Sequence, residues 1–240
     1  MLAWQEIKHR YRRSMLGPLW LTISTGAMLS AMGPLYGRLL NQDIRDYFAY
    51  LAISFMTWLL LASLITESCH TFISAEGYIK DTKLPLSVHA LRCVWRNLII
   101  FGHNLLIVFL VLLWYRPGNP TLYLLAPVGV ALVAVNGVWT AILFGLLCAR
   151  FRDIPQLVAS LVQVAFFLTP VMWKIDMLGQ NRWIAQINPL YHLLEVVRTP
   201  LLGKPPSGLS WAVALMTTAF GYLVTATLFS RFRARVAYWV

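Results

Sequence analysis

Charged side chains are scarce in this 240-residue chain, of which only 12% is Asp, Glu, Lys or Arg while 59% is apolar. The mean hydropathy is +0.65. Soluble globular domains carry about 25% charged residues, so this composition excludes that class. The chain is long enough for about six membrane-spanning helices of roughly 20 residues each.

Acidic residues are the rarest charged type, with nine Asp and Glu against 20 Lys and Arg, for a net charge of +11. In a soluble protein such a balance would suggest a nucleic-acid partner. Here the cations cluster at the ends of apolar runs, which is typical of membrane topology. We therefore expect membrane lipids, and no nucleic acid, as the environment of these cations.

Cysteine and the common catalytic motifs are also missing or sparse. The three cysteines, Cys69, Cys93 and Cys148, share no metal-ligand spacing and are odd in number, so neither a metal site nor a disulfide framework is predicted. The sequence has no GxxxxGK[ST], HExxH, CxxC or GxSxG motif. Its start, MLAWQEIKHRYRRS, lacks the short apolar core of a cleavable signal peptide. We expect no catalytic residue and no cofactor in this chain.

What the chain has instead is a series of uncharged runs, each long enough to cross a membrane. There are six of them: Ser14–Gly37, Tyr47–Thr66, Asn97–Tyr115, Leu122–Ala149, Ile154–Trp173 and Pro205–Ser230. The expected fold class is therefore an all-α membrane protein with six transmembrane helices in a single transmembrane domain, residues 1–240.

Two segments are too polar to span but carry amphipathic patterns. Residues 1–13 alternate apolar and basic side chains, which predicts an interfacial helix. In residues 174–204, Leu193, Leu194 and Val197 recur at helical spacing. We expect two short re-entrant helices there, with Asn188–Pro189 as the break, that help to form an exit mouth.

A further polar interval, residues 75–97, separates the second and third runs. Its pattern predicts a short helix over Ala75–Thr82 with Glu76 and Lys80 on one face. Pro85 ends this helix because proline disfavours helical backbone at the preceding residue. A polar helix between two spans is suited to binding a partner outside the bilayer, although an ordinary solvated loop would have a similar composition.

The distribution of Lys and Arg predicts the orientation. With the amino terminus in the cytoplasm, thirteen of these residues lie inside and seven outside. The outer seven are Arg38, Arg45, Arg116, Lys174, Arg182, Arg198 and Lys204. Both termini and residues 75–97 are thus expected on the cytoplasmic side.

Ionisable residues within the runs are few. His103 lies inside the third run, where we expect it to bond to a neighbouring helix, and Glu67 is expected to mark a helix end near the headgroups. The intramembrane carboxylates of a proton-driven carrier are missing. A transporter of this composition would need energy from a partner.

Two motifs resemble a known family. RYRRSMLGPLW at 10–20 is similar to the amino-terminal signature of type-two ATP-binding-cassette (ABC) export permeases, and NPLYHLLEVVRTPLLG at 188–203 is similar to the signature before their last span. The resemblance covers essentially the whole chain. The most similar group is the bacterial permeases that export O-antigen, capsule or teichoic acid across the cytoplasmic (inner) membrane.

The resemblance implies partners and residue roles. Two copies would enclose a channel above two ATPase subunits that bind ATP and Mg²⁺, and the cargo would be a lipid-linked polysaccharide. The ATPase-coupling helix would comprise Glu76, Gly77, Tyr78, Ile79, Lys80 and Asp81. The basic residues at the cytoplasmic mouth would be Arg10, Arg12 and Arg13. The periplasmic gate, within 174–204, would contain Asn188, Pro189, Tyr191, Glu195 and Arg198.

Aromatic rings suit a sugar channel because they pack against the C–H faces of pyranose rings. The expected channel residues are Tyr36, Phe55, Trp58, Phe166, Phe167 and Trp173. The alternative for each is a lipid-facing or interfacial position.

Other functions remain open at this point. An exporter of the same family could carry a drug or a small lipid. A membrane glycosyl or acyl transferase would need a polar catalytic cluster, which the sequence does not offer convincingly. A structural anchor would not need an amphipathic re-entrant segment.

Overall fold

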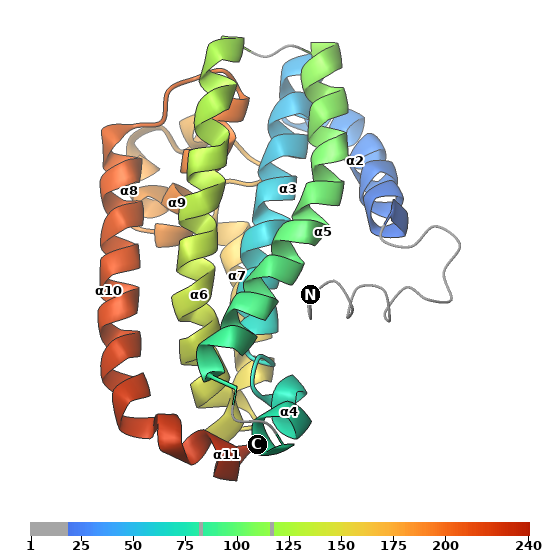
Figure 1. Cartoon of the computed structure of the whole chain (residues 1–240). Coiled ribbons are helices and arrows are strands. Elements are labelled where there is room, and N and C mark those ends of the chain that lie inside the picture. Colours follow the sequence, from blue (N-terminus) through green and yellow to red (C-terminus); the bar gives the residue numbers. More distant parts are fainter. Residues whose placement is uncertain (1–18, 82–83, 116–117) are drawn as a thin grey trace.

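The computed structural model describes residues 19–81, 84–115 and 118–240, and its regular elements there are all helical (Figure 1). The long helices are α2 (Leu19–Leu39), α3 (Ile44–Ser68), α5 (Leu86–Tyr115), α6 (Ala126–Arg150), α7 (Ile154–Leu168), α9 (Pro189–Leu201) and α10 (Gly208–Phe232). The short ones are η1 (Ile73–Ala75), α4 (Glu76–Asp81), η2 (Pro120–Leu125), η3 (Ile175–Arg182), α8 (Trp183–Gln186), η4 (Arg233–Arg235) and α11 (Val236–Trp239). The predicted interfacial helix and Arg10, Arg12 and Arg13 lie outside the described residues.

Four helical stretches are long and apolar enough to cross a membrane: Ile44–Ser68, Leu86–Tyr115, Pro120–Arg150 and Gly208–Trp239. They run up and down the molecule in an antiparallel arrangement (Figure 1). Length and composition thus confirm four of the six expected spans. The 21-residue α2, which mixes Thr, Ser and Gly with its apolar residues, and the 15-residue α7 are not in that set.

The fifth apolar run behaves differently from the prediction of a span that reaches Trp173. Helix α7 ends at Leu168 and is about 22 Å long, shorter than a hydrocarbon core of about 30 Å. Pro170 follows closely, and proline lacks the N–H that would continue the helix. Residues 169–174 therefore form irregular backbone between α7 and η3.

Helix α3 is the centre of the bundle and contacts α2, α5, α6, α7 and α9. In its most apolar window 72% of the residues are buried, compared with 17% for the window of Gly208–Trp239. A helix that is apolar on all sides is expected in the interior. The bundle is thus organised around α3, and α10 lies at its periphery.

Residues 174–204 contain three helical elements, η3, α8 and α9, where two were expected, and the predicted break at Asn188–Pro189 separates α8 from α9. Asn188 caps α9 by accepting a hydrogen bond from the Leu190 N–H at 3.0 Å, and Pro189 occupies the first turn, where its missing N–H is harmless. Helix α9 packs against α3, α6 and α10. Gly118 (φ 62°) lies so close to the end of α9 that a Cβ there would be 2.6 Å from the Leu202 carbonyl oxygen.

Polar side chains within the bundle bond both between helices and within one helix. Glu67 accepts hydrogen bonds from Arg96 and from the Asn97 amide, each at 2.8 Å, which ties the end of α3 to α5. His103 bonds to the Ile99 carbonyl of its own helix at 2.7 Å, so the expected bond to a neighbouring helix is wrong. A polar side chain in a helix can bond to the carbonyl oxygen four residues earlier in the same helix. The sequence-based expectation for His103 overlooked this possibility.

Helices α4 and α11 lie together at one end of the molecule, and the turn between α5 and α6 lies at the other (Figure 1). The predicted channel and gate residues lie on α2, α3, α7 and α9 and in the segments next to α7 and α9.

Candidate substrate groove and coupling surface

An open groove of about 420 Å³ lies between α2, α3 and α7. Four of the six expected channel residues line it: Phe55, Trp58, Phe166 and Phe167. Phe166 is the centre of this aromatic cluster, with ring centroids 6.1 Å from Phe55, 5.7 Å from Trp58 and 5.4 Å from Phe167.

Local structure explains this cluster. Phe55 and Trp58 are three residues apart on α3, so both rings project from one face. They are 8% and 4% exposed, whereas Phe167 is 66% exposed. Phe55 and Trp58 thus form the floor of the groove, and Phe167 presents its ring at the rim.

The other two expected channel residues lie outside the lining of this groove. Trp173 donates its indole N–H to the Phe167 carbonyl oxygen at 3.2 Å, which places it beyond the end of α7. Tyr36 is half-buried on α2 and packs against the main apolar core. The structure therefore brings four of the six rings together and leaves two apart.

The irregular residues 169–174 are held by side chains of α3. The Tyr47 hydroxyl donates to the Met172 carbonyl oxygen at 2.7 Å. The Tyr50 hydroxyl lies 2.8 Å from the carbonyl oxygens of both Pro170 and Trp173 and donates its hydrogen to one of them. Buried irregular backbone requires such partners because its carbonyl groups have no water to bond to.

Arg198 on α9 completes this arrangement. Its guanidinium is 3% exposed and donates to Tyr50 Oη at 2.7 Å, to Ser54 Oγ at 3.1 Å and to the Pro170 carbonyl oxygen. It also pairs with the Glu195 carboxylate and lies over the Tyr50 ring, 4.7 Å from its centroid. We call Tyr50, Ser54, Glu195 and Arg198 the buried brace.

Of the five expected gate residues, Tyr191 and Arg198 are buried, Asn188 and Glu195 are partly buried, and Pro189 is exposed. Asn188 donates from its amide to Thr169 Oγ1 at 2.8 Å, Pro189 follows it, and Tyr191 is 8% exposed. Glu195 and Arg198 belong to the buried brace. Asn188 and Arg198 link α9 to residues 169–174, and Arg198 also links α9 to α3.

At the opposite end, α4 comprises Glu76 to Asp81, the six residues of the expected coupling helix. Lys80 Nζ lies 2.6 Å from Glu76 Oε1, and the two side chains are 46% and 51% exposed. This contact holds the pKa of the Glu76 carboxyl below its ordinary value of 4.5, because hydrogen bonding and attraction to the Lys80 ammonium favour the ionised form. Tyr78 is 47% exposed.

The inner face of α4 packs on a second, smaller apolar cluster. Ile79 contacts this cluster, whose buried members include Phe72 and Leu146 together with Val236 of α11. Arg152 donates to the Trp239 carbonyl oxygen at 3.2 Å, and the Arg150 guanidinium lies 5.1 Å from the Trp239 ring centroid. Helix α11 therefore packs against α4 and α6.

Sequence reasoning missed α11, which lies beyond the last of the six uncharged runs, Pro205–Ser230. The available indication was the apolar spacing of Val236, Trp239 and Val240, which matches one face of a helix.

Within residues 19–81, 84–115 and 118–240, no group of three or more His, Cys, Asp and Glu side chains could hold a metal ion. All three cysteines are free and buried. The arrangement offers an aromatic groove, a braced irregular segment and a polar helix.

Comparison with known proteins shows the family of this chain. The ABC-2 type transporter family matches residues 1–202. The chain is 27% identical over 197 residues to an O-antigen export system permease protein RfbA of Klebsiella pneumoniae, covering 79% of this chain and 74% of that protein. It is 20% identical over 196 residues to the O-antigen export system permease protein RfbA of Myxococcus xanthus, covering 80% and 75%.

Permeases of this family pair with ABC ATPase subunits, and the family requires no cofactor site in the permease. The four long apolar helices agree with a multi-pass membrane protein. The chain therefore belongs to the ABC-2 type transporter family, as a membrane permease subunit without a catalytic domain.

Proposed function

We propose that this permease exports a lipid-linked polysaccharide, such as O-antigen, across the cytoplasmic membrane through a channel between two copies of the chain. Two ATPase subunits dock below the channel, bind ATP and Mg²⁺, and act on α4. The observation that carries this proposal is the aromatic groove between α2, α3 and α7. The O-antigen export permeases at 20–27% identity support the same cargo class.

The chemistry of the groove fits a sugar polymer. Leaving a hydroxyl without a partner against an aliphatic wall costs about 1–3 kcal/mol. Aromatic rings instead cover the apolar C–H faces and leave the hydroxyls at the ring edge hydrated. Because the stacking is not tied to one register, a polymer can slide along Phe167 and Phe166.

The surface around the groove supports a second copy as the other wall. In α7, Val158 is the one residue that is buried in the single chain. Leu157, Leu161, Val164 and Phe167 are each more than half exposed. Covering this apolar face with another α7 would remove it from lipid and close the groove into a channel.

The position of α4 supports the coupling role. It is a polar helix whose exposed face carries Glu76, Tyr78 and Lys80, while Ile79 anchors it to the bundle. A force applied to α4 is transmitted through Phe72 to the end of α3, the central helix. The expected periplasmic gate and the cytoplasmic mouth, with Arg10, Arg12 and Arg13, belong to this proposal.

Export of surface polysaccharide tests the groove. Phe167→Leu removes an exposed ring and keeps an apolar side chain, so insertion should survive. Loss of one aromatic contact of about 0.5–1.5 kcal/mol corresponds to a roughly two- to twelvefold slower export. Phe220→Leu on α10 is the matched control, since Phe220 is 70% exposed and lies outside the groove. Parental export by the Phe167 variant would exclude this ring from the path.

Orientation is tested separately by labelling from outside the cell. A cysteine placed at Asn119, in the turn before α6, should react with an impermeant thiol reagent. A cysteine placed at Arg233, beside α11, should not react. The reverse pattern would place α4 on the wrong side for an ATPase and would exclude the coupling role.

A further inference from the structure

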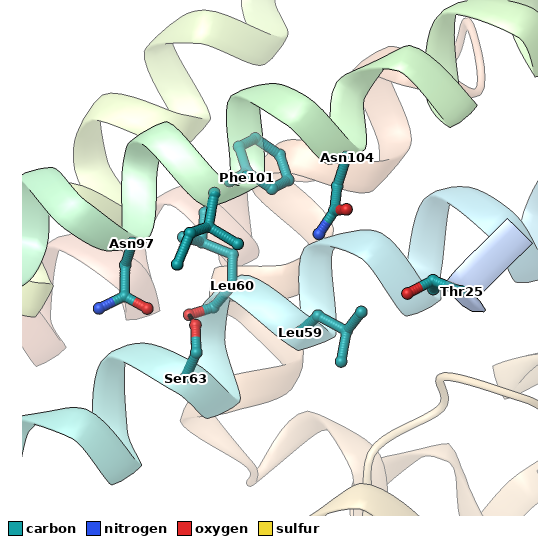
Figure 2. Close-up of a pocket in the computed structure, with 8 residues that line it drawn as sticks. Thr25, Leu59, Leu60, Ser63, Asn97, Phe101 and Asn104 are labelled. Atoms are coloured by element: carbon teal, nitrogen blue, oxygen red, sulfur yellow. Dashed lines mark hydrogen bonds between the residues drawn. The ribbon is translucent and has the colours of Figure 1, made fainter. Parts of the chain in front are cut away.

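A second cavity, of about 190 Å³, lies between α2, α3 and α5 (Figure 2). Four polar side chains from these three helices line it: Thr25, Ser63, Asn97 and Asn104. In Figure 2 their polar ends converge on the space between the helices. None of the eight described residues that line the cavity carries a charge. Nothing in the aromatic groove or the coupling surface accounts for this polar cluster in the apolar bundle.

The orientation of Asn97 is fixed by its neighbours. Its Nδ2 lies 2.8 Å from the Glu67 carboxylate and 2.9 Å from the Cys93 carbonyl oxygen, and both of these atoms are acceptors. Turning the amide over would set Oδ1 against two acceptors, so Nδ2 must face them and Oδ1 must face the other way. Asn97 is 2% exposed.

In this orientation Asn97 Oδ1 is buried and has no hydrogen-bond partner among the described residues. Burying an acceptor without a partner costs roughly 1–3 kcal/mol. Asn104 offers the complementary group, because its Oδ1 accepts from Thr22 at 3.1 Å and its amide nitrogen points toward the cavity (Figure 2). The site thus presents an acceptor and a donor, and the hydroxyl groups of Ser63 and Thr25 lie beside them.

The remaining walls are apolar. Phe101 is 5% exposed and faces the same space, together with Leu59 and Leu60. At about 30 Å³ per molecule the cavity has room for about six waters. Waters in such a cluster bond to one another and to the four polar side chains, but Phe101 and the leucines offer them no partner. A ligand with hydroxyls at its edge and an apolar face satisfies both kinds of wall.

Leu59 lines both this cavity and the aromatic groove. The cavity therefore adjoins the groove across the seam between α2 and α3.

From these observations we propose that the cavity is a binding site for one uncharged, hydroxyl-bearing sugar ring. Asn97 Oδ1 accepts from a ring hydroxyl, the Asn104 amide donates to another, and Phe101 packs against the C–H face. The choice of a sugar as ligand rests on the proposed export function. The site would hold one sugar unit beside the path of the polymer.

The test uses the purified permease in lipid nanodiscs with Ser63→Cys as a reporter. Its reaction with methyl methanethiosulfonate, a small neutral reagent, is followed by mass spectrometry, and the natural chain with its buried cysteines gives the background. The probes are octyl glucoside and octyl phosphocholine at equal submicellar concentrations. The two share a tail, but only the glucoside has an uncharged hydroxylated ring.

We expect the glucoside to slow labelling about fivefold at about four times its Kd and the phosphocholine to leave it unchanged. Adding Asn104→Leu should abolish the protection. Asn136→Leu is the matched control, because Asn136 is equally buried on α6, its amide is bonded to the Leu132 carbonyl, Thr218 and Trp139, and it is outside the cavity.

Three results would overturn the proposal: an unreactive cysteine, equal protection by both probes, or reaction without protection by the glucoside, which would mean that the cavity holds water alone. The assay needs neither ATPase nor transport. If the glucoside gives no protection while polysaccharide export is normal, only the sugar site is excluded. If the glucoside protects but the cells export no polysaccharide, the proposed export function is excluded.

Discussion

Two ion pairs in opposite halves of the molecule have the same chemistry and very different surroundings (Figure 1). In the buried brace, the Glu195 and Arg198 side chains are 13% and 3% exposed, and Arg198 also bonds to Tyr50, Ser54 and the Pro170 carbonyl. On α4, the Glu76 and Lys80 side chains are 51% and 46% exposed.

The difference shows which charges hold the fold and which are available to a partner. Removing one charged partner of a buried pair leaves the other charge uncompensated. Substituting either charged residue of the buried brace should therefore lower the folding free energy considerably. An exposed pair is screened by water and contributes little to stability. The brace therefore positions residues 169–174, while the pair on α4 can exchange its contacts when an ATPase docks.

The largest expected effect is at the brace. Arg198→Ala leaves the Glu195 carboxylate and the Pro170 carbonyl oxygen without their cation, and we expect a loss of about 3–5 kcal/mol in folding free energy. The midpoint of thermal unfolding in detergent, followed by tryptophan fluorescence, measures it. Arg182→Ala is the matched control, because the Arg182–Asp176 pair is 52% and 71% exposed and should contribute about 0–1 kcal/mol. Equal midpoints for the two variants would show that burial does not distinguish the pairs.

The next effect is on coupling. Ile79→Pro removes a backbone N–H, introduces a clash with the carbonyl four residues earlier, and costs about 3 kcal/mol within the helix. Because α4 lies outside the long apolar helices, we expect normal insertion but loss of ATPase co-purification. Gly77→Ala is the control: a Cβ there meets nothing within 4 Å in this chain, and alanine favours the helix. Retention of the ATPase by the proline variant would exclude α4 as the docking element.

The smallest effect concerns the exposed pair itself. The Lys80 ammonium lowers the pKa of Glu76 in the folded helix, so the pair stabilises α4 above the unfolded pKa and this contribution is lost as the pH falls through the folded pKa. Amide exchange of residues 76–81, corrected for intrinsic rates, should show slightly more protection than in Glu76→Gln at pH 7. The two should converge once the pH is below the pKa of Glu76 in the folded helix, which is lower than the ordinary value of 4.5. A difference that persists in acid would assign the protection to something other than this pair.

Several features of the fold and site were predictable because their causes are local. Charge and Pro85 delimit the polar helix, and the structure places α4 at Glu76–Asp81. Asn188 and Pro189 carry a cap and a first-turn proline in adjacent positions, so the start of α9 is visible in the chain. The spacing of Phe55 and Trp58 placed both rings on one face of α3.

The errors have equally specific causes. The fifth run is apolar as far as Trp173, yet α7 stops at Leu168 because Tyr47, Tyr50 and Arg198 supply the hydrogen bonds that irregular backbone needs. Composition shows that a segment is apolar, but it does not show which distant side chains will donate hydrogen bonds to the carbonyl oxygens of that segment. For the same reason Tyr36 and Trp173 could not be separated from the four rings of the groove.

By itself the sequence determined the helical class, the membrane setting, the position of α4 and the break before α9, since these follow from hydrophobic runs, charge and proline within a few residues. Only the tertiary structure decided that Arg198 meets Tyr50 across 148 residues and that Thr22 meets Asn104 across 82. Such contacts depend on which helices the fold brings side by side, and they form because a buried polar group without a partner costs free energy.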